Sequence, residues 1–258
     1  MLELNKIYCQ DNVEGMRLLD DECIDLTVTS PPYDNLRKYN GYSFDFENVA
    51  KELYRVTKQG GVVVWVIGDA TIKGSETGTS FRHALYFMEC GFCLNDTMIW
   101  RKMNPMPQVK QPRYSQCFEY MFVFIKGKPK TFNPIMRKTK CGGQNYDSTC
   151  KNMGGEKGRI EKHFIINNET VEYNVWDIAI AQNKTIHSAV FPEQLVRNHI
   201  TSWSNEGDIV LDCFMGSGTT AIAALQLGRK YIGFEISQEY VDIANKRIAS
   251  EPSYLSFF

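Results

Sequence analysis

Residues 209–235, IVLDCFMGSGTTAIAALQLGRKYIGFE, decide the fold class of this chain. A short apolar run predicts a strand over 209–211, and the apolar spacing after it predicts a helix over 219–227 that ends at Gly228. A second apolar run predicts a strand over 230–234. A strand, a glycine-containing turn, a helix and another strand in this order indicate a parallel α/β sheet covered by helices on both faces.

The loop between the first strand and the helix is a candidate ligand site, because small ligands bind at the carboxyl ends of such strands. Asp212 ends the strand, and Gly216 and Gly218 allow a ligand to approach the backbone closely. Glu235 ends the next strand 23 residues after Asp212, near the spacing at which a carboxylate binds ribose hydroxyls. The pattern predicts an adenosine-type cofactor. The alternative is a tight turn that only packs the helix on the strand.

The rest of the chain shows two regular blocks around an irregular middle. Apolar runs and spacing predict further strands over 24–29, 62–67, 97–100 and 120–125, and helices over 45–58, 80–90, 192–202 and 237–249. Gly60 and Gly61 are expected to stop the helix over 45–58. Phe81, Ala84, Leu85 and Met88 are expected to form the inner face of the helix over 80–90. The middle shows no sustained period and predicts short strands and loops.

Charge is distributed unevenly along the 258 residues, although the net charge is only −1. Residues 101–163 hold 14 Lys+Arg against 4 Asp+Glu, and the remainder holds 15 against 26. One basic segment on an acidic body predicts a polyanion-binding protein, with a lysine-rich solvated surface as the alternative. The sequence shows no apolar run long enough for a membrane span and no secretory signal, and its eight scattered cysteines indicate reduced thiols. We expect a cytoplasmic protein.

The turn Ser30-Pro31-Pro32-Tyr33 is the second candidate site, since it follows a predicted buried strand and should lie at the same edge of the sheet. Proline fixes φ and has no N–H, so the turn offers the Ser30 hydroxyl and the Pro31 carbonyl as a rigid pair of acceptors. Two acceptors suit the two hydrogens of an exocyclic amine on a planar ring, on which Tyr33 could stack. The alternative is a proline turn that ends the strand.

Together these motifs resemble those of the S-adenosylmethionine-dependent amino-methyltransferases of DNA. That family carries a Ser/Asp/Asn-Pro-Pro-Tyr motif and a Phe-x-Gly-x-Gly motif, found here at 30–33 and 214–218. The catalytic motif comes first, which is similar to the circularly permuted β group of the family. The resemblance implies a Rossmann-like α/β methyltransferase sheet of about seven strands. It also implies a catalytic half over 1–127, a small target-recognition insert over 128–184, and a cofactor-binding half of the same domain over 185–258.

The resemblance also assigns residue roles. It implies catalysis by Ser30, Pro31, Pro32 and Tyr33, and S-adenosylmethionine binding by Asp11, His187, Asp212, Phe214, Gly216, Gly218, Thr219, Thr220 and Glu235. Arg101, Lys102, Arg113, Arg137 and Lys138 are the expected DNA-binding residues. The single Cys90-x-x-Cys93 has no second pair, so we expect no metal site. Double-stranded DNA is the expected partner; the family resemblance also allows a cognate restriction endonuclease and a homodimer, and no membrane partner is expected.

The implied reaction is direct methylation of an exocyclic amine on a base flipped out of the duplex. Serine at the first catalytic position favours cytosine N4, and adenine N6 is the alternative. Other classes of protein fit these motifs less well. A nicotinamide or flavin oxidoreductase lacks support because Ala221 stands in place of the third glycine, and a P-loop is excluded because no Gly-Lys-Ser/Thr follows the loop. A DNA-binding protein without catalysis, and a methyltransferase acting on protein or RNA, fit the turn and the basic segment less well.

Overall fold

The computed structural model describes residues 2–32, 44–105, 112–151, 159–180 and 192–251, with the side chains of 147–151 and 159–162 left aside. The chain divides into two compact units. The first comprises residues 1–133 and 174–258, and the second comprises residues 134–173. The second unit is therefore narrower than the 128–184 segment expected from the sequence.

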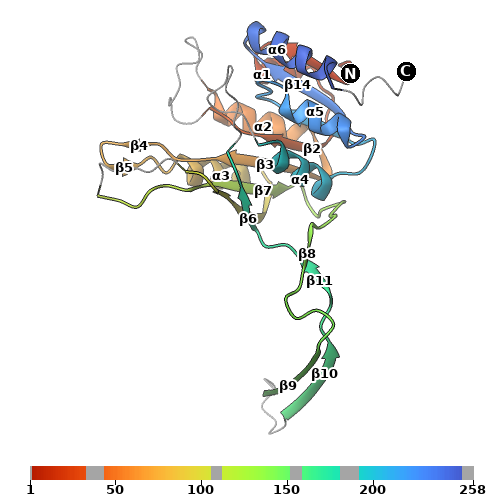
Figure 1. The fold of residues 1–258 in the computed structure, drawn as a ribbon. Helices are drawn as coiled ribbons and strands as arrows, with labels where there is room; N and C mark the ends of the chain where they lie inside the picture. The colour runs from red at the N-terminus through yellow and green to blue at the C-terminus, as the bar shows by residue number, and fades with distance from the viewer. Residues whose placement is uncertain (1, 33–43, 106–111, 152–158, 181–191, 252–258) are drawn as a thin grey trace. The chain divides into compact units, whose positions relative to one another are not determined.

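An eight-stranded mixed sheet forms the centre of the first unit, in the order β1-β14-β13-β2-β3-β7-β6-β12 (Figure 1). Its strands are β1 (Lys6–Cys9), β2 (Ile24–Thr29), β3 (Thr57–Ile67), β6 (Cys93–Lys102), β7 (Phe118–Ile125), β12 (Val175–Ile178), β13 (Ile209–Asp212) and β14 (Lys230–Glu235). Only β7 is antiparallel to its neighbours β3 and β6. The predicted α/β fold class is confirmed, with β12 as a further edge strand drawn from the irregular middle.

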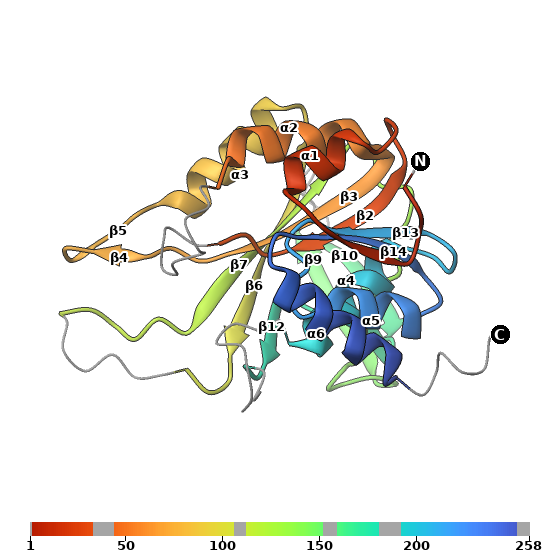
Figure 2. The ribbon, with the colours of Figure 1, turned by 90° about the horizontal axis from the view of Figure 1, so that it is seen from above.

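Helices cover both faces of this sheet (Figure 2). One face carries α1 (Asn12–Arg17), α2 (Phe46–Val56) and α3 (Thr79–Glu89), and the other carries α4 (Glu193–Trp203), α5 (Thr219–Gln226) and α6 (Gln238–Ala249). All six residues of β2 are buried, as a central strand between two helical layers requires. A small hairpin of β4 (Thr71–Ile72) and β5 (Ser75–Glu76) precedes α3. No helix in the described part of the chain is long and apolar enough to cross a membrane.

The expected end of α2 was wrong. The helix ends at Val56, and Thr57 takes an extended conformation and starts β3 directly. Gly60 lies inside that strand with φ +78°, where an added Cβ would come within 2.9 Å of the Lys128 carbonyl oxygen. Glycine is therefore needed at 60 for close approach of another backbone segment, and not to stop the helix.

The expected inner face of α3 was also wrong, because Phe81, Leu85 and Met88 are exposed. The buried face consists of Ser80, His83, Ala84 and Phe87. Tertiary contacts fix this rotation of the helix. The Nδ1 atom of His83 accepts a hydrogen bond from Trp65 Nε1 at 3.2 Å, and its ring stacks on Phe46 with centroids 3.6 Å apart. The Ser80 hydroxyl and amide both donate to Asp69, which ties the first turn of α3 to the end of β3.

His199 of α4 lies in the core and makes the stability of the fold depend on pH. Its ring is fully buried, lies 4.6 Å from the Trp176 ring centroid, and places Nε2 3.3 Å from the sulfur of Met121. Burial lowers the pKa of His199 to about 3, whereas an unfolded chain gives histidine a pKa of about 6.5. Between these values only the unfolded chain binds the proton, so the stabilisation is complete above about pH 6.5 and decreases as the pH falls.

We expect the melting temperature of the wild type to fall more between pH 7.5 and pH 5 than that of His199→Phe. Phenylalanine keeps a ring against Trp176 but cannot take up a proton. In the wild type, proton uptake by His199 in the unfolded chain lowers the free energy of unfolding by up to about 1.4 kcal/mol per pH unit. Thermal unfolding followed by circular dichroism at the two pH values checks this. Equal falls in the two proteins would contradict the assignment of the pH dependence to His199.

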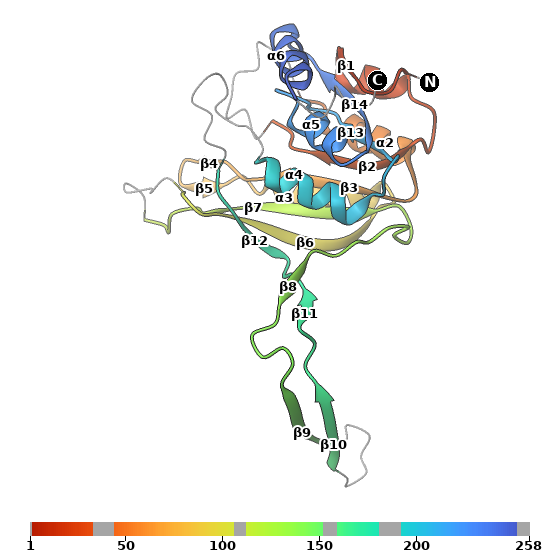
Figure 3. The same cartoon turned by 45° about the vertical axis from the view of Figure 1, so that its right-hand side comes forward.

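The second unit consists of two short antiparallel ladders along the same two segments of chain (Figure 3). They are formed by β8 (Met136–Lys138) with β11 (Glu169–Val171), and by β9 (Asn145–Lys151) with β10 (Arg159–Ile165). Tyr146 and Phe164 face each other across the second ladder, with ring centroids 5.0 Å apart, and both are exposed. This unit is a two-stranded ribbon with exposed side chains rather than a second hydrophobic core.

Candidate functional site

Four neighbouring parallel strands, β1, β14, β13 and β2, end at the same edge of the sheet. Asp11 follows β1, Glu235 ends β14, Asp212 ends β13 and Ser30 follows β2. The register places Cys9 beside Glu235, and Asp212 beside Gly233. The fold therefore brings to one edge the residues that the sequence placed in the cofactor site and in the catalytic turn.

Asp212 is the most enclosed charged group at this edge, with 2% of its surface exposed. Its Oδ1 atom accepts hydrogen bonds from the Thr29 hydroxyl at 2.6 Å and from the Phe214 amide at 3.0 Å. Its Oδ2 atom accepts from the Thr220 hydroxyl at 2.6 Å. These three bonds join the carboxylate to the end of β2, the glycine loop and the start of α5, so Asp212 holds the loop in place from the inside of the fold.

Burial raises the pKa of the Asp212 carboxyl to about 6, although the hydrogen bonds from Thr220, Thr29 and the Phe214 amide oppose this. The group is therefore mostly ionised above pH 7 and able to accept all three bonds. Burial also raises the pKa of the neighbouring Cys213 thiol. A protonated, buried thiol is not a nucleophile, so Cys213 does not supply the thiolate that methylation of a ring carbon requires.

Glu235 is held in a defined orientation at the end of β14. The Gly216 amide donates to its Oε2 atom at 2.9 Å, and the Ser237 amide donates to its Oε1 atom at 3.0 Å. Each oxygen of a carboxylate can accept two hydrogen bonds, so one backbone donor leaves each oxygen a further lone pair. The half-buried Glu235 is thus arranged to accept two more donors, such as a pair of ribose hydroxyls.

The two glycines of the loop serve different purposes. Gly218 has φ +84°, and a Cβ there would lie 2.8 Å from the Cβ of Ala244, so glycine allows the loop to pack on α6. Gly216 has φ +52°, and the nearest atom to an added Cβ would be the Phe214 carbonyl oxygen at 3.9 Å. Among the residues that the structure describes, no closer atom surrounds that position, so a side chain at 216 would extend into space that a ligand could use.

Asp11 caps α1 and retains acceptor capacity. Its Oδ1 atom accepts from the backbone amides of Val13 and Glu14 at 2.9 and 3.1 Å, while Oδ2 has no hydrogen bond to the residues that the structure describes. The side chain is exposed, and the amide of the preceding Gln10 bonds to the Glu235 carbonyl oxygen at 3.1 Å. Asp11 therefore lies directly beside Glu235 with one oxygen available to an amine donor.

The remaining cofactor residues occupy the loop and the start of α5. Phe214 is half-buried and packs edge-on against Phe44, with ring centroids 5.4 Å apart. Thr219 and Thr220 are buried, and neither caps the helix with its side chain, because Gly218 is the N-cap residue. Arg247 of α6, which no sequence motif indicates, donates to the Ser217 carbonyl oxygen at 2.5 Å and holds the loop from the helix side.

The catalytic turn begins directly after β2. Ser30 and Pro32 are half-buried and Pro31 is buried, as expected for a turn at the mouth of a site. Tyr33 and His187 lie outside the described residues, so their predicted roles rest on the sequence alone. Thr29, the residue before the turn, was also missed by the sequence analysis, because its threonine resembles any other in a buried β-branched strand.

The predicted DNA-binding cations differ in their surroundings. Arg101 and Lys102 end β6 at the same edge as the site, three strand spacings or about 15 Å from β2. Arg101 forms a bidentate ion pair with Asp177 that is about half exposed. Lys102 pairs with Glu119 at 2.6 Å in more buried surroundings. An exposed ion pair contributes little stability, so Arg101 is the freer of the two to contact a phosphate.

Of the other three cations, Arg113 lies in the segment before β7 and contacts the β4–β5 hairpin, and Arg137 and Lys138 lie on β8 of the second unit. Arg113 donates to the Thr71 hydroxyl at 2.9 Å and to the Gly74 carbonyl oxygen at 2.6 Å. Arg137 lies 4.0 Å from the ring centroid of Tyr173 and 3.5 Å from a carboxylate oxygen of Glu172. Lys138 is exposed. Arg113 therefore stabilises the hairpin, Arg137 contacts Tyr173 and Glu172, and the exposed Lys138 is accessible to a phosphate.

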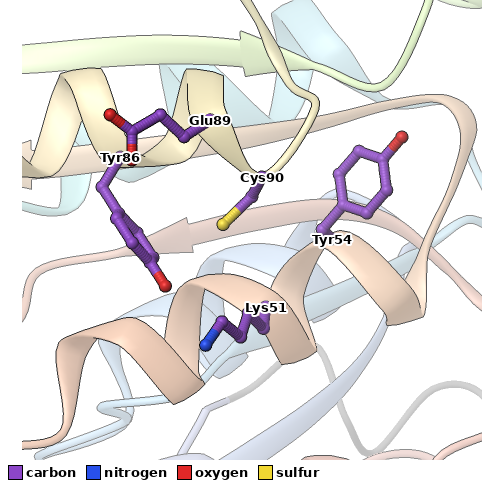
Figure 4. A pocket seen from close by; sticks show the side chains of 5 residues that line it. All are labelled: Lys51, Tyr54, Tyr86, Glu89 and Cys90. Carbon is purple, nitrogen blue, oxygen red and sulfur yellow. The ribbon is translucent and has the colours of Figure 1, made fainter.

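A pocket elsewhere, between α2 and α3, includes none of the predicted site residues (Figure 4). Its lining consists of Lys51, Tyr54, Tyr86, Glu89 and Cys90. Burial raises the pKa of the Cys90 thiol, which keeps it protonated. Within the part of the chain that the structure describes, no group of three or more His, Cys, Asp or Glu residues is placed to hold a metal ion.

Comparison with known proteins identifies the class of enzyme to which this arrangement belongs, with its parallel strand ends, glycine loop and proline turn. A family model described as DNA methylase, for N6 and N4 methyltransferases, matches residues 24–246. The chain belongs to this family and is a DNA amino-methyltransferase. The resemblance noted from its motifs is thus confirmed.

Particular relatives match most of the chain. The orphan methyltransferase M.BamHII of Bacillus amyloliquefaciens is 56% identical over 240 residues, covering 89% of this chain and 90% of that protein. The crystal structure of the M1.HpyAVI complex with S-adenosylmethionine is 26% identical with a TM-score of 0.61, covering 94% of this chain and 98% of that one. The cytosine-N4-specific PvuII DNA methyltransferase is 21% identical with a TM-score of 0.70, covering 95% and 86%, and shows the likeness of fold.

S-adenosylmethionine is the cofactor of this family, and the residues present fit it. The open space beside Gly216 gives room for the ligand against the loop. The remaining lone pair on each Glu235 oxygen suits a ribose hydroxyl, and the Oδ2 atom of Asp11 suits the adenine amino group. These three features lie on adjacent strand ends.

Proposed function

We propose that this protein methylates the N4 amine of cytosine in double-stranded DNA, with Ser30 to Pro32 holding the amine. The observation that carries the proposal is the placement of this turn. It begins at the end of β2, and β2 pairs directly with β13, which leads into the glycine loop. Serine at position 30, rather than a carboxylate or amide side chain, favours cytosine N4 over adenine N6 within the family pattern.

The turn would act by orienting the nucleophile. The lone pair of an exocyclic amine is delocalised into the ring, so the amine reacts slowly unless its hydrogens are held in place. The Ser30 hydroxyl and the Pro31 carbonyl supply two acceptors for these hydrogens, and the prolines keep both acceptors fixed. Orientation of this kind can lower a barrier by about 7–11 kcal/mol at its upper limit.

The cofactor side of the proposal assigns Glu235 to the ribose hydroxyls, Asp11 to the adenine amine and Gly216 to close backbone approach. S-adenosylmethionine supplies an electrophilic sulfonium methyl group when bound. In the transfer, the amine nitrogen would bond to the methyl carbon as the carbon–sulfur bond breaks, S-adenosylhomocysteine would be the leaving group, and the methylated amine would release one proton to water. His187 is proposed to lie beside the methionine end, and Tyr33 to stack on the flipped base.

DNA recognition is assigned to the 128–184 segment, which contains the second unit. A two-stranded β-ribbon fits the major groove of B-DNA, and β9 with β10 forms such a ribbon. Its exposed Tyr146 and Phe164 offer apolar contacts to base edges. Arg101 and Lys138 are the favoured phosphate ligands, because neither is held in buried pairs.

Nucleoside mass spectrometry tests the base assignment. Amplified, unmethylated genomic DNA is incubated with the protein and S-adenosylmethionine, digested to nucleosides and compared with a reaction containing Ser30→Ala. We expect N4-methylcytosine in the wild-type reaction only. N6-methyladenine in its place would overturn the cytosine assignment, and the absence of any methylated base would contradict activity on DNA of mixed sequence.

The proposal extends to the location and partners of the protein. A cytoplasmic location gives the enzyme access to genomic DNA. A cognate restriction endonuclease would require the same target sequence to be methylated by this protein. A homodimer would double the mass of 29.6 kDa, which light scattering of the purified protein measures directly.

A further inference from the structure

The backbone pairing between β2 and β13 ends before the site begins. Its last pair joins Leu211 to Thr27, one residue before Asp212 and two residues before Thr29. Beyond that pair, the hydrogen bond from the Thr29 hydroxyl to Asp212 links the two strand ends at 2.6 Å. The Cys213 sulfur, 3.8 Å from the same hydroxyl oxygen, makes a second and weaker contact.

Thr29 is thus held on both sides. Its backbone pairs with Trp65 of β3, and its fully buried side chain reaches Asp212 on the other side. Asp212 in turn receives the Phe214 amide of the glycine loop and the Thr220 hydroxyl of α5. One buried carboxylate therefore joins the strand that carries the proline turn to the loop that carries the cofactor residues.

We propose that Thr29 is a positioning residue for methyl transfer, which fixes the Ser30–Pro32 turn relative to the glycine loop through Asp212. The inference rests on the proposed role of the turn as the holder of the target amine. In-line transfer requires the amine nitrogen to lie about 3–3.5 Å from the methyl carbon with the orbitals aligned, and a misplacement of about 1 Å can slow a reaction about 100-fold. The two sides of the reaction are bound by different strands, so a link between the strand ends sets that distance.

The chain offers matched comparisons for this role. Thr27 precedes Thr29 by two residues on the same strand, is also fully buried, and has a hydroxyl without a hydrogen-bond partner in the described residues. Thr27→Val removes a hydroxyl of the same kind without touching the link. Thr220→Val removes a different donor from the same carboxylate, namely the hydroxyl that bonds to Oδ2. Thr29→Val removes one donor from Oδ1, which keeps its bond from the Phe214 amide.

The experiment measures kcat, the dissociation constant for S-adenosylmethionine and the melting temperature in Thr29→Val, Thr29→Ser, Thr27→Val and Thr220→Val. Methyl transfer is followed with radiolabelled S-adenosylmethionine, so either methylated base is counted. We expect Thr29→Val to lower kcat about 10- to 100-fold with the dissociation constant within about threefold. Thr29→Ser should restore kcat, and Thr27→Val should leave it unchanged. Thr220→Val should lower the melting temperature most and weaken cofactor binding more than it lowers kcat.

A purely structural role predicts a different order, in which kcat follows the melting temperature and Thr220→Val is the slowest variant. That order, or an unchanged kcat in Thr29→Val, would overturn the proposal. If Thr29→Val does not fold, the test rests on Thr29→Ser. A low kcat in a well-folded Thr29→Ser would also overturn the proposal. Ser30→Ala in the same series separates this inference from the proposed function. An unchanged kcat there overturns the role of the turn, whereas a slow Ser30→Ala beside a fast Thr29→Val overturns only the link.

Discussion

Ser30→Ala is expected to slow methyl transfer about 100-fold or more while leaving cofactor affinity nearly unchanged. The substitution removes one of the two acceptors that we propose hold the target amine, and it leaves the Pro31 carbonyl in place. Ser30 follows β2, whereas the cofactor residues Asp11 and Glu235 follow β1 and β14, so no cofactor contact is removed. Single-turnover methylation of saturating DNA measures the rate, and calorimetry measures the affinity for S-adenosylmethionine.

The comparison of rate and affinity decides the role of Ser30. A large loss of cofactor affinity with an unchanged rate at saturation would place the hydroxyl in the cofactor site. A loss of both, together with a lower melting temperature, would make Ser30 a structural residue of the turn. Only a slow reaction at undiminished affinity agrees with orientation of the amine.

Glu235→Ala is expected to weaken the binding of S-adenosylmethionine about 10- to 100-fold, since a hydrogen bond to a charged group contributes about 1.5–3 kcal/mol. The carboxylate is positioned by the Gly216 and Ser237 amides, so its loss also loosens the loop at Gly216. The rate at saturating cofactor should fall much less than the affinity. Calorimetric titration of the variant with S-adenosylmethionine gives the dissociation constant.

Glu239→Ala is the matched control, because Glu239 is exposed in the first turn of α6 and its loss changes the net charge equally. It should bind the cofactor as the wild type does. Equal weakening in both variants would show a general charge effect, and unchanged affinity in Glu235→Ala would remove Glu235 from the site.

The elements at the two ends of the chain were predictable because their signals are local. The β-branched run of β2, the spacing of apolar residues in α2 and the glycine loop before α5 each lie within a dozen residues. The sequence also shows the order of the two motifs, with the proline turn before the glycine loop. These patterns were enough to indicate the α/β fold class and the family.

What sequence reasoning missed depends on partners far apart in the chain. Contacts with Trp65 and Asp69 determine which face of α3 is buried. The edge strand β12 forms by parallel pairing with β6. Arg247 reaches a loop 30 residues away. The periodicity of apolar residues along a helix shows where they lie around its axis. It does not show which of two overlapping helix faces packs against the core.

Asp212 shows the division most clearly. The sequence by itself determined that a carboxylate ends the strand before a glycine loop, and this was sufficient to expect a nucleoside cofactor there. Only the tertiary structure decided that the carboxylate turns inward, because its partner Thr29 lies 183 residues away and meets it through the pairing of β2 with β13. A buried charge must be satisfied by donors within the protein, and strand order, which local sequence does not encode, determines which donors are near.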